Sequence, residues 1–184
     1  MTSPSEHFDW KKQRPIFNSC TILPGLHGLG QAKKTIYSID EPNIYATFIG
    51  GIAVNQGTYQ QQSSLSLSES VDIQGIIRVA PTDILFNPNE TADIFVYAET
   101  TFPSLPGTFY YGLGEDYNVY AWDGNNTNLI PFMKNVPVDT GQLFISLYHG
   151  TFYYPGTLKV FFGYRLGDEM IVKTPQPIIV DISP

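Results

Sequence analysis

Residues that most enzymes use for catalysis are few in this chain. A nucleophile activated by a histidine and an acid needs a histidine, and the sequence has three, His7, His27 and His149. His149 is the best placed of them, since it stands beside Gly150 at the end of an expected strand. A single histidine at a strand end is more typical of a hydrogen-bonded polar residue than of a catalytic base. We therefore expect no catalytic histidine.

A pair of carboxylates could serve glycoside hydrolysis, in which one acts as an acid and the other as a base or nucleophile. Glu115 and Asp116 are adjacent in an expected turn, and Tyr110, Tyr111 and Tyr117 are close to them in the sequence. Acids in a turn are normally solvated, and adjacency along the chain does not set the separation of two carboxyl groups in space. The sequence therefore predicts a protein that is not an enzyme and has no catalytic residues.

Oxygen ligands for a hard cation are concentrated in one loop. Asp123, Asn125, Asn126 and Asn128 are close together in the sequence, and carboxylate and amide oxygens are ligands that Ca2+ prefers. The EF-hand pattern fails here, because Lys134 stands where that motif closes with a glutamate. The alternative is a loop that needs no cation. Ca2+ at this loop is the one cofactor that the sequence leaves open.

Aromatic side chains accompany the expected turns and strand ends, where they could stack on the apolar faces of sugar rings. The candidates for a glycan-binding platform are Tyr120, Trp122, Tyr153 and Tyr154, with Tyr110 and Tyr111 beside them. The competing interpretation is that these rings pack within the fold, because aromatic residues favour half-buried pleated surfaces. Two sequons, Asn89-Glu90-Thr91 and Asn125-Asn126-Thr127, fall in expected loops that could accommodate attached glycans.

The composition excludes several classes of partner. Charged residues make up 15% of the chain and the formal net charge is -7, whereas nucleic-acid binding depends on clustered Lys and Arg. The basic cluster Lys11, Lys12 and Arg14 is too short to change this expectation. No run approaches the roughly 20 apolar residues of a membrane helix. We expect neither a nucleic-acid partner nor insertion into a membrane.

Cysteine usage and polar composition bear on the compartment. The one cysteine, Cys20, excludes an intramolecular disulfide, and it is interpreted as a small packed residue or a thiol that pairs between molecules. Met1 is followed by Thr-Ser-Pro-Ser-Glu-His and not by a basic and then apolar segment, so no leader is recognisable. Uncharged polar residues are abundant, which is more typical of proteins outside the cell. We predict an extracellular or cell-surface protein whose leader is not present in this sequence.

Residues 157–166 form the clearest expected strand. Leu158, Val160, Phe162, Tyr164 and Leu166 alternate with Thr157, Lys159, Gly163 and Arg165, and Phe161 alone interrupts the polar face. A period of two is typical of a half-buried strand. We expect its apolar face to pack against Ile94, Val96, Leu143, Ile145 and Leu147.

About ten short strands at turn spacings, with no helical period, predict an all-β protein, an antiparallel β-sandwich of immunoglobulin-like or jelly-roll-like type. The sandwich is expected to span 32–184, with 32–70 either part of it or a smaller β-layer. Residues 59–67 are interpreted as a loop or an exposed edge strand, and 80–90 as a long connection. Other expected strands are 34–39, 44–54, 71–79, 92–99, 108–113, 118–122, 129–132, 143–148, 170–173 and 178–182.

Several short motifs in 71–184 carry a resemblance. They are Ala92–Ala98, Trp122-Asp123-Gly124, Leu129–Phe132, Tyr148-His149-Gly150, Pro155-Gly156 and Phe162–Leu166. In these features the chain resembles a recurrent β-sandwich module of secreted and cell-surface bacterial proteins, which is often appended to other domains. The motifs are turns and strand faces, so they carry no catalytic residues over. The resemblance implies export and a non-enzymatic extracellular role.

Residues 1–31 have no sustained period and are expected to form an extended arm. The arm contains apolar side chains that make no core of their own, and we take Phe8, Trp10, Ile16 and Phe17 as its anchors. A sandwich must pair or protect its edge strands, and an extended segment can add to such an edge through main-chain hydrogen bonds. The arm could equally fold back on its own domain, and the sequence does not distinguish the two. The prediction that we make is a structural or adhesive subunit that associates with identical subunits through this arm, as a filament where the contact does not close a ring. The alternative function is a carbohydrate-binding module.

Overall fold

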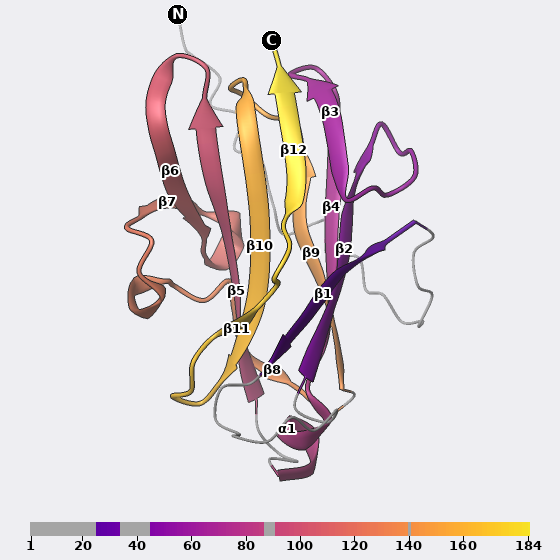
Figure 1. The fold of residues 1–184 in the computed structure, drawn as a ribbon, viewed down its shortest axis with the longest axis vertical. Helices are drawn as coiled ribbons and strands as arrows, with labels where there is room; N and C mark the ends of the chain where they lie inside the picture. The colour runs from indigo at the N-terminus through magenta and orange to yellow at the C-terminus, as the bar shows by residue number, and fades with distance from the viewer. Residues whose placement is uncertain (1–24, 34–44, 87–90, 140) are drawn as a thin grey trace, which may run out of the picture.

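The structure is a computed structural model that describes residues 25–33, 45–86, 91–139 and 141–184. These residues form two β-sheets packed face to face, which confirms the predicted all-β sandwich (Figure 1). The smaller sheet has the spatial order β1 (His27–Lys33), β2 (Tyr45–Val54), β4 (Val71–Arg78) and β9 (Gln142–Gly150), and all its ladders are antiparallel.

The larger sheet contains the remaining described strands. Its order is β3 (Gln62–Ser66), β12 (Ile178–Ser183), β10 (Gly156–Leu166), β5 (Thr91–Phe102), β6 (Leu105–Leu113) and β7 (Val119–Trp122), with β11 (Val172–Lys173) on β10 and β8 (Met133–Pro137) on β5. Of the two interpretations of residues 59–67, a loop or an edge strand, the structure shows an edge strand, β3. It pairs with β12 in parallel, which departs from a fully antiparallel sandwich, because β3 is reached from β2 in the other sheet and not through a hairpin.

Three local expectations need correction. The connection after β4 contains a short helix, α1 (Pro81–Phe86), which begins at a proline as helices often do. Residues 129–132 are not a strand, because Pro131 has no N–H to donate, and the strand on β5 begins only at Met133. β1 begins at His27, so the expected boundary between arm and sandwich at residue 31 falls inside a strand.

Within the described ranges, two further short helices are 3-10 turns that flank β7, η3 (Glu115–Tyr117) and η4 (Asn126–Asn128). Strand β2 and strand β3, which come from the range 32–70, lie in different sheets and contribute to one shared core. The expected strand at 34–39 lies outside the described residues.

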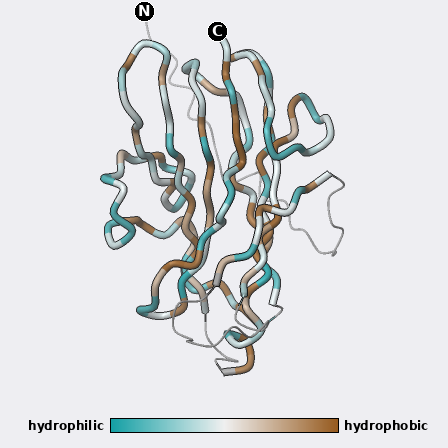
Figure 2. The backbone as a smooth tube through the Cα atoms, in the orientation of Figure 1, coloured by the Kyte–Doolittle hydropathy of each residue, from teal (hydrophilic) through white to brown (hydrophobic). Residues whose placement is uncertain are grey.

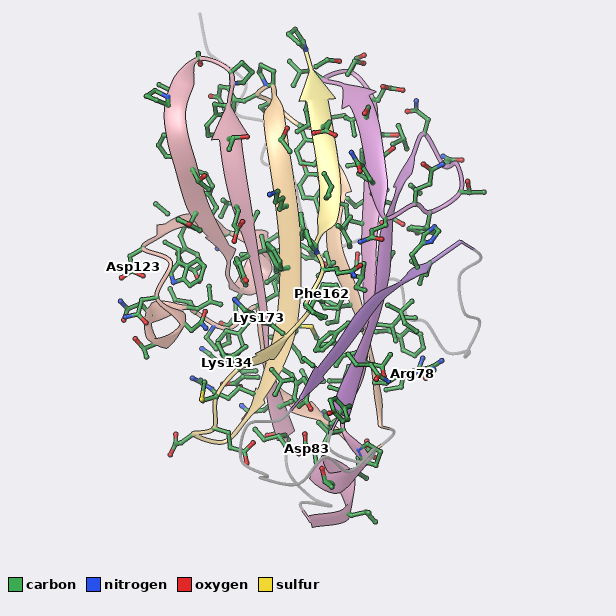
Figure 3. The ribbon with its side chains drawn as sticks, in the orientation of Figure 1. Arg78, Asp83, Asp123, Lys134, Phe162 and Lys173 are labelled. Carbon is green, nitrogen blue, oxygen red and sulfur yellow. The ribbon has the colours of Figure 1, made fainter. Side chains whose placement is uncertain are left out.

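The core between the sheets is built on the predicted face of β10. Val160, Phe162 and Tyr164 belong to one buried cluster with Ile94, Val96, Leu143, Ile145 and Leu147, and Leu158 packs on its margin. Phe162 lies in the middle of the sandwich (Figure 3); its ring meets Phe48 edge to face, with centroids 5.9 Å apart. Hydrophobic residues run along both sheets (Figure 2). The predicted core face of this strand is therefore confirmed, with Leu158 only partly buried.

Close approach of the two sheets at Phe162 depends on a glycine. A Cβ atom on Gly75 of β4 would lie 2.9 Å from Cζ of Phe162, closer than side-chain atoms normally approach. The aromatic ring therefore occupies the space that any larger residue at position 75 would need.

One end of the sandwich is joined to α1 by a buried hydrogen bond. The Tyr164 hydroxyl donates to Oδ2 of Asp83 at 2.7 Å and accepts from the backbone N–H of Ala80 at 3.3 Å. Burial, and then the charge of Asp83, raise the pKa of Tyr164 above its ordinary value. Asp83 belongs to the first turn of α1, at this end of the molecule (Figure 3). A polar pair therefore fixes where the connection between the sheets packs.

Candidate functional site

The outer face of the larger sheet carries an aromatic cluster instead of a uniformly polar surface. Phe95 and Tyr97 of β5, which alternate with the core residues of that strand, are buried, and Phe161 of β10 is half-buried. Phe161 and Tyr97 are cross-strand neighbours, and their rings stack at 5.0 Å and 12°. The outer face of an antiparallel sheet is normally polar. The core between the two sheets therefore does not explain why these aromatic residues are buried.

Strand β7 completes the aromatic cluster. Trp122 packs against Tyr97 with ring centroids 4.9 Å apart and meets Tyr110 edge to face at 6.0 Å. Gly112 lies between Tyr97 and Tyr120 across the strands, and a Cβ on this glycine would be 2.1 Å from Cζ of Tyr120. The Tyr120 ring can therefore lie over β6 only because residue 112 has no side chain. We call Tyr97, Tyr110, Tyr120, Trp122 and Phe161 the aromatic face.

A lysine lies at the aromatic face. Lys173 of β11 donates a 2.7 Å hydrogen bond from Nζ to the Tyr97 hydroxyl, and the same Nζ is 4.9 Å from the centre of the Tyr97 ring. Burial, and then nearby Glu99, raise the pKa of Tyr97 above its usual range. In the register of β10, β5 and β6, Lys159, Glu99 and Tyr110 form the next row across the strands. Charged groups thus border the rings on this face, as in sites that combine stacking with hydrogen bonds.

The structure separates the predicted glycan-binding residues into two groups. Tyr120 and Trp122 belong to the aromatic face, where Tyr120 exchanges hydrogen bonds with the backbone of Ile130 and Trp122 donates from Nε1 to the carbonyl of Asn125. Tyr153 and Tyr154 lie in the loop between β9 and β10 and are 81% and 72% exposed. Within the described residues, the ring contacts of Trp122 are to Tyr97 and Tyr110 and not to this loop.

Sequence reasoning missed Tyr97, Phe161 and Lys173 as members of the aromatic face. The available signal was Phe161, the one apolar residue on the polar side of its strand. The pairing of β5 with β10, which puts Tyr97 directly opposite Phe161, could not be derived from either strand alone.

The candidate calcium loop is held by its own hydrogen bonds. Asp123 accepts from the backbone N–H of Asn125 at 2.8 Å and from the side-chain amide of Asn128 at 2.6 Å. The side-chain oxygen of Asn125 accepts from the N–H and the hydroxyl of Thr127, at 3.1 and 3.0 Å. The hydrogen bonds that Asp123 accepts, from the Asn125 N–H first and then from the Asn128 amide, lower the pKa of Asp123. The exposed loop, whose Asp123 is labelled in Figure 3, directs its oxygens at internal donors, so we derive no chemistry from a cation there. The sequon at Asn125 lies in the same loop.

The candidate carboxylate pair lies in the turn between β6 and β7. Glu115 forms an exposed ion pair with Lys134, with 3.1 Å between Oε1 and Nζ. Asp116 is exposed and its backbone has a φ of 58°, in the left-handed region that few side chains adopt. The two acids therefore form a solvated turn.

His149 lies on the outer face of the smaller sheet, opposite Asp72. Its Nδ1 is 3.7 Å from Oδ1 of Asp72, a carboxylate that also accepts from the Tyr59 hydroxyl and from Nε2 of Gln74. Burial, and then the hydrogen bond to Asp72, raise the pKa of Tyr59. The histidine side chain is 70% exposed. This cluster joins β4 to the loop before β3.

A second surface lies where the two sheets approach each other between β8 and β9. A groove there is lined by residues of both sheets, among them Ile94 and Leu143 from the core and Phe144 and Met133 from the surface. β9 is the last strand of the smaller sheet, and among the described strands its partner is β4. The four predicted arm anchors, Phe8, Trp10, Ile16 and Phe17, lie outside the described residues, as do Cys20 and Asn89.

In the described ranges no group of three or more His, Cys, Asp or Glu side chains is placed to hold a metal ion. No helix among the described residues is long and apolar enough to cross a membrane. Comparison of the chain with models of protein families and with curated proteins finds no match.

Proposed function

We propose that this protein is a non-enzymatic structural or adhesive subunit of an extracellular or cell-surface assembly, in which the N-terminal segment of one copy adds to a sheet edge of the next. The observation that carries the proposal is the position of β9, which is the last strand of the smaller sheet among the described residues and lies beside a groove that reaches the core residues Ile94 and Leu143. Free strand edges are sites of strand addition unless they are covered or charged. Phe144, half exposed at 49%, adds apolar area at this edge.

Removal of residues 1–24 tests the proposal. The full-length protein should form species larger than a monomer as its concentration rises, whereas the shortened chain should remain a folded monomer. Light scattering coupled to size exclusion measures the mass, and a cooperative unfolding transition shows that the shortened chain is folded. A shortened chain that assembles as the full-length protein does would refute this function.

The aromatic face favours a second candidate function, carbohydrate binding. Tyr110 and Trp122 present accessible ring surface next to Glu99 and Lys159, and rings beside hydrogen-bonding groups are the usual composition of a ligand site. Retention on insoluble polysaccharides tests this candidate: Trp122→Ala and Tyr110→Ala should each abolish it, and Tyr154→Ala, in the loop between β9 and β10, should not. A wild-type protein that is not retained and binds nothing on a broad glycan array would exclude it.

A further inference from the structure

A hollow lies on the outer face of the larger sheet, where β10 begins and where β5 and β12 end. Its volume is about 400 Å3, and the strands that border it, β3, β12, β10 and β5, are neighbours in the sheet (Figure 1). Its polar lining residues stand in one row across these strands, in the order Ser64, Asp181, Thr157 and Thr101. The positions in this row alternate with the core positions of their strands. Three hydroxyls and a carboxylate therefore face outward together.

The carboxylate in this row is held by its neighbours. The Thr157 hydroxyl donates to Oδ1 of Asp181 at 2.8 Å, and Nε2 of Gln62 donates to Oδ2 at 3.1 Å. Each carboxylate oxygen can accept a further hydrogen bond from a ligand. Phe102 and Pro103, at the end of β5, form the apolar side of the hollow. A fixed acceptor between hydroxyls, with a ring beside it, suits a ligand that carries several hydroxyl groups.

The next row along the same strands joins the hollow to the aromatic face. It contains Lys159, Glu99, Tyr110 and Trp122, which are successive neighbours across β10, β5, β6 and β7. Lys159 follows Thr157 by two residues, so the two rows are about 7 Å apart. Glu99 and Lys159 place an acceptor and a donor between the hollow and the rings. The outer face is thus one continuous strip from the hollow to Trp122.

The charges along this strip balance. Lys159 and Lys173 are its cations, and Glu99 and Asp181 are its anions. Arg165, further along β10, is paired with Asp93, with 3.3 Å between Nη2 and Oδ2. Residues 25–184 as a whole carry seven basic and fifteen acidic side chains. A neutral strip on an acidic body is complementary to a ligand without net charge.

The strip is longer than one sugar ring. From β10 to β7 there are three steps between neighbouring strands, each of about 4.8 Å, and the change of row adds about 7 Å along the strands. Together these components give roughly 16 Å between Thr157 and Trp122. A single ring therefore reaches either the hollow or the aromatic face, whereas a chain of rings reaches both.

From these observations, and resting on the carbohydrate-binding candidate described above, we infer that the outer face of the larger sheet binds a chain of neutral, β-linked hexose units. One part of the chain stacks on Tyr110 and Trp122, and another part places its hydroxyls in the hollow, against Asp181 and Thr101. The β-linked class follows because mostly equatorial hydroxyls leave the ring faces apolar for stacking, and because the linkage keeps successive rings in line.

NMR titration of the full-length protein with oligosaccharide ladders tests the inference. The probes are β-linked di-, tetra- and hexasaccharides of glucose, mannose and N-acetylglucosamine. In at least one ladder the affinity of the wild type should rise with chain length. Thr101→Val with Asp181→Asn should weaken binding of that hexasaccharide roughly tenfold, the effect of one or two lost hydrogen bonds, and should leave the disaccharide unchanged. Trp122→Ala should weaken binding at every length.

A matched control removes the same chemical groups elsewhere. Thr47→Val with Asp168→Asn changes the outer face of the smaller sheet and the turn after β10, and it should bind every ladder as the wild type does. Asp181→Asn also alters the partner of Thr157. If the first double variant fails to unfold cooperatively, Thr101→Val with Ser64→Ala replaces it and should give the same selective loss.

The outcomes separate the inference from the candidate on which it rests. If Trp122→Ala abolishes binding but the variant of the hollow binds the hexasaccharide as the wild type does, the aromatic face acts alone; the inference is overturned and carbohydrate binding stands. Affinity that does not depend on chain length, or a glycan array that shows binding to anionic chains and to none of the three ladders, has the same meaning. A wild type that binds no glycan overturns both.

Discussion

At the scale of single residues, the core depends on Phe162. The side chain is fully buried, and Phe48 and Gly75 enclose it from the smaller sheet. Phe162→Ala should lower the free energy of unfolding by about 3–5 kcal/mol, because it removes the buried ring and leaves a cavity that the two sheets cannot fill. Denaturant unfolding measures the change. A loss below about 1 kcal/mol would mean that the ring is not enclosed as described.

Tyr164 predicts a stability difference that depends on pH. Tyr164→Phe should cost about 1–3 kcal/mol at pH 7, since it leaves the buried carboxylate of Asp83 without one of its donors. The folded-state pKa of Tyr164 lies above the unfolded value of about 10. Its contribution is therefore complete below pH 10 and is lost as the pH rises above 10. The wild-type advantage should shrink in alkaline denaturation series, and a constant advantage would contradict the assignment. Tyr154→Phe, at an exposed residue, is the control.

The two faces of β10 illustrate what local sequence can and cannot predict. Alternation identified Val160, Phe162 and Tyr164 as core residues, because a strand between a core and a different environment must alternate. The same rule predicts no partner for Phe161. Its stacking on Tyr97 depends on the pairing of two strands that are far apart in the chain, and Lys173 reaches the same rings from a third strand.

At the scale of elements, β7 is held in place by the absence of a side chain at residue 112. Gly112→Ala should destabilise the protein by about 1–3 kcal/mol, because the added methyl group would overlap the Tyr120 ring and separate its hydroxyl from Ile130. Thermal unfolding measures this loss. Gly28→Ala is the matched control, since no atom lies within 4 Å of its added Cβ. Equal effects of the two substitutions would show that the Tyr120 ring does not require this glycine.

Turn and strand boundaries were predicted less well than strand faces. The run 129–132 is apolar and was assigned to a strand, yet Pro131 interrupts it and pairing with β5 starts at Met133. The oxygen-rich residues 123–128 are linked by hydrogen bonds among themselves, and Ca2+ at this loop stays a prediction. The contacts within both segments are to particular partners, which composition does not specify.

At the scale of the whole molecule, the two sheets enclose one core, and the described residues of β8 and β9 line a groove between the sheets. The body is acidic, the N-terminal segment is basic in residues 11–14, and the two are expected to meet between copies. Assembly should therefore weaken as salt is added, because screening reduces the attraction between exposed charges. Sedimentation at rising NaCl concentration measures this trend. Assembly that is insensitive to salt would show that attraction between these charges does not contribute to it.

Hydrogen exchange of the β9 backbone tests the central claim most directly. In the assembled wild type, amides of β9 that do not donate to β4 should exchange more slowly than in the chain that lacks residues 1–24, because an added strand accepts their hydrogen bonds. Amides of β7, the last described strand at its end of the larger sheet, should exchange equally in the two proteins. The same exchange along β9 in both, or new protection confined to β7, would contradict strand addition at β9.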